Sequence, residues 1–242
     1  MAYPHPLIAK FERELTLSVA ENQAVSAIAI RPLKFVRNYD LVRKGNRSLH
    51  CVMILAGLAG TSKTDGSGKR QTIAFHMSGD MPDLQSLHLD VNDSDVRAIS
   101  DCTATFIEHS TLRSLCEQYP RIGATLWRDT LVHSSIFREW VVNVGSRPAL
   151  KRVAHLLCET MKRAQWLGLS DEMTCDFPVT QTDLSDATGL SIVHVNRMLQ
   201  DLRKRELISF VHGKLTIHNW SDLCSLAGFE DTYLHQPRQS DV

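Results

Sequence analysis

The segment from residue 177 to 210 most constrains the fold, because it carries the start and stop signals of two short helices. Thr180 can cap the first helix, and Asp183 stands at the third position that a capping box requires. Gly189 follows where that helix must end, since glycine adopts the left-handed conformation at little cost. Ser191 can cap a second helix, whose apolar residues recur at three- and four-residue steps.

A β-hairpin is predicted after the second helix, because two apolar runs flank the turn residues His212 and Gly213. Helix, turn, helix and hairpin make a winged helix, which can place its second helix in the DNA major groove. Arg197 can pair with a guanine edge, and Asn196 can reach adenine or phosphate. The residues expected to contact DNA are Thr180, Gln181, Ser191, Val193, His194, Asn196, Arg197, Gln200 and Arg203.

The charge of the chain gives this prediction mixed support. Lys and Arg number 27, as do Asp and Glu, whereas nucleic-acid-binding domains are usually basic. Positive charge is instead local, at Arg197, Arg203, Lys204, Arg205 and Lys214. Phosphate attraction acts over about 8–10 Å at physiological salt, so a local cluster can suffice. The alternative is an ordinary helical hairpin with a solvated polar face.

The same segment resembles the DNA-binding domain of the CRP/FNR family of bacterial transcription regulators. The resemblance lies in Gly189-Leu190-Ser191, in His194-Val195-Asn196-Arg197 and in the tail over residues 229–235, which is similar to one subgroup. It implies that Arg197 is the recognition arginine. One residue departs from the family pattern, which commonly has Glu four positions before that arginine, where this chain has Val193.

Short apolar runs separated by Gly- and Asp-rich turns occupy residues 33–107, and the clearest turn is Asp65-Gly66-Ser67-Gly68-Lys69. Many short strands indicate an all-β sandwich or barrel. This part resembles the cyclic-nucleotide-binding-like jelly roll that forms the sensor of CRP/FNR proteins. The expected fold class is therefore α+β, with an N-terminal β jelly roll, a long dimerisation helix and a C-terminal winged helix-turn-helix.

The resemblance places the start of a phosphate-binding cassette at Gly79 and Asp80, and it implies ligand contacts at Gly79, Asp80 and Leu84. Where the family's phosphate-pairing arginine should fall, the chain reads Asp90-Val91-Asn92-Asp93-Ser94-Asp95. Three carboxylates there would repel a phosphate. Arg97 is close in the sequence but is expected at the surface of a strand. The sequence thus argues against cyclic AMP and leaves the effector open.

Neither an iron–sulfur cluster nor haem is supported by the residues present. An iron–sulfur sensor, as the resemblance implies for the oxygen-responding branch of the family, needs thiolates close together. No such set stands near the N-terminus, and the six cysteines are scattered without a CxxC pair. Haem could use His50, His76, His88 or His109, although a single histidine on a strand is more often hydrogen-bonded in the core or at the surface. A redox role for Cys51, Cys102 or Cys116 stays open.

A long amphipathic helix is expected from about Arg121 to Val144, with polar positions Asp129 and His133 near its apolar stripe. It could pack only on its own β domain, but the resemblance implies the parallel seam of a homodimer. Arg147-Pro148 marks a hinge, and 168–178 is expected as a linker. The predicted domains are 1–118 for the sensor, 119–145 for the dimerisation helix and 146–242 for DNA binding, with 236–242 disordered.

These features predict a homodimeric, sequence-specific transcription regulator that binds double-stranded DNA at a near-palindromic operator and also meets RNA polymerase. The absence of an apolar membrane span and of a signal peptide favours the cytoplasm. The alternative is a ligand-binding regulatory module that acts on a protein partner without touching DNA. An enzyme is not expected, because the chain lacks a His-x-His metal pair, a P-loop and a Gly-x-Ser-x-Gly motif.

Overall fold

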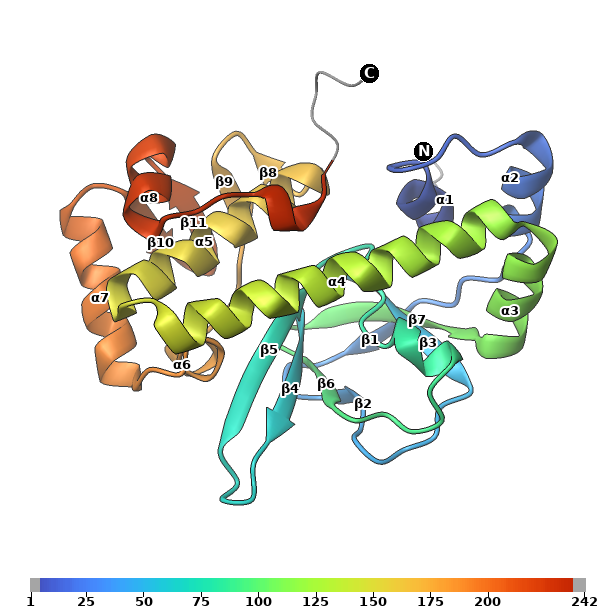
Figure 1. Ribbon diagram of the computed structural model, residues 1–242, viewed down its shortest axis with the longest axis horizontal. Coiled ribbons are helices and arrows are strands. Elements are labelled where there is room, and N and C mark those ends of the chain that lie inside the picture. Colours follow the sequence, from blue (N-terminus) through green and yellow to red (C-terminus); the bar gives the residue numbers. More distant parts are fainter. Residues whose placement is uncertain (1–4, 237–242) are drawn as a thin grey trace. The chain divides into compact units, whose positions relative to one another are not determined.

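The computed structural model describes residues 5–236 (Figure 1). Contacts between residues divide the chain into two compact units. The first comprises Met1–Lys63 and Phe75–Leu131, and the second comprises Thr64–Ala74 and Val132–Val242. Within residues 5–236, no helix combines the length and the apolar character needed to cross a lipid bilayer.

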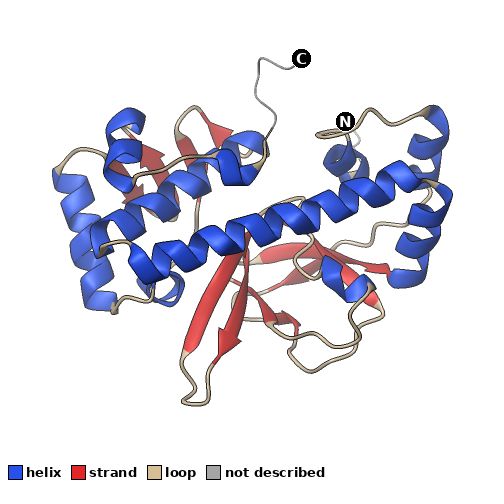
Figure 2. Cartoon of the chain, viewed as in Figure 1, coloured by secondary structure: helices blue, strands red, loops and turns tan. Residues whose placement is uncertain are grey.

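Seven strands form two antiparallel sheets in the N-terminal half, and Figure 2 draws them in red. One sheet has the order β1-β7-β3 and the other β2-β6-β4-β5. The strands are β1 (Leu33–Phe35), β2 (Asp40–Val42), β3 (His50–Ala56), β4 (Ala59–Thr64), β5 (Arg70–His76), β6 (Asp95–Ala98) and β7 (Cys102–Glu108). The short strands and the Gly- and Asp-rich turns of the sequence therefore do build the expected β domain.

Side chains that alternate along these strands form the core of the first unit. Val52 and Ile54 of β3 pack with Val96 of β6 and Ala104 of β7. The opposite side of β3 packs against the helices α1 (Pro6–Phe11), α2 (Val19–Ser26), η1 (Leu84–Leu87) and α3 (His109–Gln118). The strand β3 is thus buried on both faces, which explains its almost unbroken apolar sequence.

The turn between β3 and β4 requires glycine at position 57. Gly57 has a φ of +83°, and a Cβ there would lie 2.4 Å from the carbonyl oxygen of Asp101. Gly68 has the same φ but no atom within 4 Å of a Cβ. We expect Gly68→Ala to lower the free energy of unfolding by about 1 kcal/mol, through backbone strain alone. Gly57→Ala should cost at least about 3 kcal/mol, because backbone must also move.

Urea unfolding of the two alanine variants measures this difference. Equal losses of stability would show that the close approach to Asp101 carries no cost.

The helix α4 (Pro120–Ser146) presents two apolar stripes. Ile122, Leu126, Ile136 and Trp140 are buried, whereas Trp127, Leu131, Phe137 and Val141 are exposed, Trp127 at 69% and Phe137 at 45%. The sequence predicted a single apolar stripe, and that stripe combined residues that are buried in the structure with residues that are exposed. Asp129, predicted to lie near a dimer seam, accepts a hydrogen bond from Lys10 at 3.0 Å.

The C-terminal half contains helices around a small antiparallel sheet of order β10-β11-β9-β8 (Figure 2). Its elements are α5 (Ala149–Trp166), β8 (Ser170–Asp171), β9 (Thr174–Asp176), α6 (Gln181–Thr188), α7 (Ile192–Lys204), β10 (Ile208–Val211), β11 (Lys214–Ile217), α8 (Trp220–Ala227) and η2 (Thr232–Leu234). Arg147 and Pro148, where a hinge was predicted, lie between the end of α4 at Ser146 and the start of α5 at Ala149.

The expected linker over 168–178 is wrong, since β8 and β9 lie within it. The acidic residues there are exposed, while Cys175 faces the core at 3% exposure and pairs across the sheet with Leu215. The strands β8 and β9 have only two and three residues, which is too few for an alternating apolar pattern to be recognised in the sequence. The disorder predicted for 236–242 lies, from Pro237 onward, outside the described residues.

Candidate nucleic-acid interface

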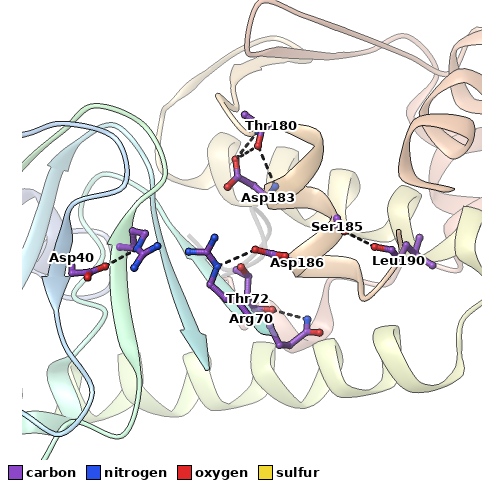
Figure 3. A network of polar contacts seen from close by, with 10 residues as sticks. Asp40, Arg70, Thr72, Thr180, Asp183, Ser185, Asp186 and Leu190 are labelled. Atoms are coloured by element: carbon purple, nitrogen blue, oxygen red, sulfur yellow. Dashed lines mark hydrogen bonds and ion pairs between the residues drawn. The ribbon is translucent and has the colours of Figure 1, made fainter. Parts of the chain in front are cut away.

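The first helix of the predicted helix-turn-helix has the capping geometry that its sequence predicts (Figure 3). The Thr180 hydroxyl accepts the Asp183 N–H at 3.2 Å, and the Asp183 carboxylate accepts the Thr180 N–H at 2.7 Å. Gly189 closes α6 with a φ of +66°. The Ser185 hydroxyl then donates to the carbonyl of Leu190 at 2.5 Å, which holds the turn between the helices.

Both carboxylates of α6 are engaged within the second unit. Asp183 belongs to the capping box, and Asp186 accepts the Arg70 Nε–H at 3.0 Å (Figure 3). Thr180 and Gln181, which were predicted to contact DNA, are exposed at the start of α6. An incoming phosphate would therefore meet helix N–H groups and hydroxyls at this end, with little opposing free negative charge.

The second helix separates a buried face from an exposed polar face. Ser191 caps α7 by accepting the His194 N–H at 3.2 Å. The apolar residues at three- and four-residue steps, Val195, Met198, Leu199 and Leu202, are all buried. The predicted DNA-contacting residues lie on the other side: Ser191, Val193, Arg197, Gln200 and Arg203 are exposed, and His194 and Asn196 are half-buried.

The wing follows α7 as an antiparallel hairpin. His212 and Gly213 both have positive φ, at 49° and 74°, which is the conformation that a tight two-residue hairpin turn requires. Arg203 donates to the Phe210 carbonyl at 2.9 Å and so joins the end of α7 to β10. Of the nine predicted contact residues, Arg203 thus has a structural partner that its position in the sequence did not reveal.

A buried polar network supports this unit from the side of α5. The Glu159 carboxylate accepts the Trp140 indole N–H at 2.9 Å and the Tyr233 hydroxyl at 2.8 Å. Burial raises the pKa of Glu159 and that of Tyr233. The network links α4, α5 and η2, three elements that are far apart in the sequence, and no motif in the sequence indicates it.

His155 lies beside this network and stays neutral. The imidazole is 1% exposed and stacks on the Tyr233 ring with centroids 5.9 Å apart. Burial and the nearby Arg147 lower its pKa from 6.5 to about 3. Glu139 lies 3.3 Å from Nε2, but its carboxylate is already paired with Arg147 at 2.5 Å, so it does little to favour the imidazolium.

The depressed pKa of His155 predicts a loss of stability in acid. Between pH 6.5 and about 3 the unfolded chain binds a proton at this residue that the folded chain does not, so stability is present above pH 6.5 and falls as the pH falls. From pH 6.5 to 5, wild type should lose about 2 kcal/mol more than His155→Gln. Urea unfolding at both pH values measures this, with the exposed His88→Gln as control; equal losses in all three proteins would contradict it.

Comparisons with known proteins agree with this geometry. Residues 151–226 match the family model for a Crp-like helix-turn-helix domain, and residues 32–119 match that for a cyclic nucleotide-binding domain. The chain is 25% identical over 195 residues to the transcriptional activator protein FnrL of Cereibacter sphaeroides, covering 76% of each chain. It is 24% identical over 214 residues to the nitrogen fixation regulation protein FixK of Azorhizobium caulinodans, covering 86% of this chain and 85% of that one. The chain belongs to the CRP/FNR family of transcription regulators.

Solved structures show the same fold. FixK2 from Bradyrhizobium japonicum matches with a TM-score of 0.75 at 20% identity, over 84% of this chain and all of that one. A CRP-family regulator from Thermus thermophilus matches with a TM-score of 0.62 at 18% identity, over 81% of this chain and 97% of that one. The match to the Crp-like helix-turn-helix model and the likeness to the transcriptional activator FnrL and to FixK support a DNA-binding transcription regulator, and they do not support the alternative of a module that acts only on a protein partner.

The segment at Gly79 and Asp80, where a phosphate-binding cassette was expected to start, is contacted by the chain's own residues. Gly79 has a φ of +96°, and an Arg13 guanidinium nitrogen lies 2.8 Å from where its Cβ would stand. Asp80 is buried, and its carboxylate accepts the Met77 N–H at 2.8 Å. Leu84, the third candidate ligand contact, packs in the hydrophobic core at 4% exposure.

Two carboxylates of the acidic stretch 90–95, which was predicted to repel phosphate, form an ion pair or a hydrogen bond with nearby residues. Asp93 pairs with Lys63 at 2.7 Å, and Asp95 accepts the Lys44 N–H at 2.8 Å. Arg97, expected at the surface, is half-buried, and its guanidinium pairs with Asp40 of the neighbouring strand at 2.6 Å.

The four histidines considered as haem ligands divide into two kinds. His50 and His88 are exposed. His76 is buried and lies 2.7 Å from the Thr61 hydroxyl, and His109 is buried and lies 2.9 Å from the Ser86 hydroxyl. Burial lowers the pKa of His109. Two of the four histidines are thus hydrogen-bonded in the core, and the other two lie at the surface.

Proposed function

We propose that this chain works in the cytoplasm as a homodimer that binds a near-palindromic DNA operator and controls transcription through contact with RNA polymerase. The observation that carries this proposal is the second helix of the helix-turn-helix. Its buried face is wholly apolar, and its exposed face presents the side chains that can read base edges. Residues 146–242 act as the DNA-binding domain, 119–145 as the dimerisation helix and 1–118 as the sensor.

The roles proposed for individual residues follow from where α7 holds them. Arg197 projects from the exposed face one to two turns from the helix start, where its guanidinium can pair with a guanine. Val193, at 71% exposure, offers an apolar contact such as a thymine methyl. Ser191, His194, Thr180 and Gln181 stand near helix N-termini, where N–H groups favour phosphate.

The exposed stripe of α4 supports the homodimer. Trp127, Leu131, Phe137 and Val141 lie within about a third of the helix circumference, and monomeric proteins rarely leave such a contiguous apolar stripe in water. A second copy of α4 would cover these side chains in a parallel coiled coil. Two-fold symmetry would then place the two copies of α7 one helical turn of DNA apart.

The effector proposed for the sensor is not a cyclic nucleotide. The Asp80 carboxylate accepts the Met77 N–H, and Arg13 lies against Gly79. Residues 90–95 carry carboxylates where the family's phosphate-pairing arginine would be. A cyclic phosphate would have to displace Arg13 and approach Asp80. Gly79, Asp80 and Leu84 are retained as the place where an effector of other chemistry would act on the sensor.

Selection of bound sites from random duplex DNA tests the proposal. We expect an enriched inverted repeat whose half-sites are about 10 base pairs apart, centre to centre. Sedimentation of the free protein should show a dimer, and Phe137→Glu should shift it toward monomer and weaken operator binding. Gln118→Glu, which adds the same charge at an exposed residue of α3, is the control. Enrichment of no sequence, or a monomer at every concentration, would refute the proposal.

A further inference from the structure

Two cysteines that are far apart in the sequence meet inside the DNA-binding domain. Cys158 lies on α5 and Cys224 on α8, and their sulfur atoms are 3.9 Å apart. Among residues 5–236, this is the one contact between two cysteine sulfurs. A disulfide bond is about 2.05 Å long, so the sulfurs must approach by nearly 2 Å, a distance within reach of side-chain rotation and a small shift of α8.

The two thiols have different surroundings, which gives them different chemical roles. Cys158 is fully buried, whereas Cys224 is half-buried and can meet a small solute. Between the two thiols, Cys224 donates a hydrogen bond to the Cys158 sulfur. A Cys224 thiolate would instead accept a hydrogen bond from the Cys158 thiol, which lowers the pKa of Cys224, and Lys162 acts in the same direction. That hydrogen bond and burial raise the pKa of Cys158. Cys224 is therefore the sulfur that becomes a thiolate, and Cys158 is the sulfur that keeps its proton.

We propose that Cys158 and Cys224 form an oxidisable pair, in which hydrogen peroxide converts the two thiols into a disulfide between α5 and α8. The Cys224 thiolate attacks a peroxide oxygen, the O–O bond breaks, and the departing hydroxide takes a proton to become water. Cys224 is then a sulfenic acid. The Cys158 sulfur next attacks it, the S–S bond forms, the S–O bond breaks, and the Cys158 proton leaves with the hydroxide as a second water. The sulfurs are oxidised and the peroxide is reduced.

The other cysteines lack this arrangement. Cys51 and Cys175 are buried, and burial raises the pKa of each thiol to about 12. Burial also raises the pKa of Cys102 and of Cys116, although Cys116 is half-buried as Cys224 is. Cys116 is therefore a control of matched exposure without a sulfur partner. The pair also lies close to the DNA-reading part of the unit, because α5 packs against both α7 and α8.

Treatment of the full-length, reduced protein with one equivalent of hydrogen peroxide, followed by alkylation, proteolysis and mass spectrometry, tests the proposal. We expect a peptide that joins Cys158 to Cys224, and its loss on addition of dithiothreitol. Cys116→Ala should leave this yield unchanged. Cys158→Ala should stop the reaction at a Cys224 sulfenic acid, which dimedone traps, and Cys224→Ala should leave Cys158 reduced.

Three results would overturn the proposal. They are the absence of the joined peptide in wild type, oxidation of Cys158 in the Cys224→Ala protein, and faster labelling of Cys116 than of Cys224 in the Cys158→Ala protein. Circular dichroism of each variant verifies that it is folded, and Cys224→Ser serves as a second variant if the alanine protein is unstable. None of these readouts uses DNA, so they are independent of the proposed operator binding.

Discussion

Replacement of Arg197 by alanine should weaken binding to the selected operator about 5- to 150-fold, because a good bidentate contact to a base contributes about 1–3 kcal/mol. Arg197 is exposed on α7, opposite the buried Val195, Met198 and Leu199. The loss should concentrate at one base position of each half-site, and selectivity there should relax. Gel shifts with the operator and with single-base variants measure both effects.

A matched control separates base reading from charge. Arg205 is an exposed arginine that follows the last turn of α7, so Arg205→Ala removes the same charge outside the base-reading face. We expect it to weaken specific and non-specific DNA alike and to lower the salt dependence of binding by about one phosphate contact. If Arg197→Ala bound the operator as wild type does, α7 would not be the recognition helix.

Removal of the Glu159 carboxylate should be the most destabilising single change within the DNA-binding domain. Glu159→Ala removes the carboxylate that accepts the buried Trp140 indole N–H and the Tyr233 hydroxyl, and it opens a cavity. Two such donors and the lost volume should lower the free energy of unfolding by about 3–5 kcal/mol. Urea unfolding followed by tryptophan fluorescence measures the change, since Trp140 lies at the site.

Two conservative variants and one control test that explanation. Glu159→Gln keeps one carbonyl oxygen as an acceptor, and Tyr233→Phe removes one donor without emptying the site, so each should cost about 1–2 kcal/mol. The exposed Glu230→Ala should change stability by less than about 0.5 kcal/mol. A loss below about 1 kcal/mol for Glu159→Ala would show that water or another group satisfies the two donors.

Local signals in the sequence were reliable where neighbouring residues decide the structure. The capping box of Thr180 and Asp183, the left-handed Gly189 and the Ser191 cap all occur as predicted, because each depends on hydrogen bonds between residues three or four positions apart. The hairpin at His212 and Gly213 follows for the same reason. These elements were enough to indicate the winged helix and the family.

Contacts between distant residues were not predictable in this way. Two short strands lie in the segment 168–178, where composition predicted a linker, because their stability comes from pairing with β11. The apolar residues of α4 form a buried and an exposed stripe, which periodicity alone did not distinguish. Arg13 lies against Gly79 although 66 positions separate them. The sequence around Gly79 therefore gave no sign of this contact.

The sequence by itself determined the two-part α+β organisation and the helix-turn-helix with its cap residues, because periodicity and capping act over a few residues. It also indicated the exposed side chains of α7 that we propose read DNA. Only the tertiary structure decided that Glu159 joins Trp140 to Tyr233, that His155 stays neutral, and that Cys158 meets Cys224 across 66 positions. Which polar and sulfur atoms are buried together depends on which helices pack against one another, and patterns over a few residues do not predict that packing.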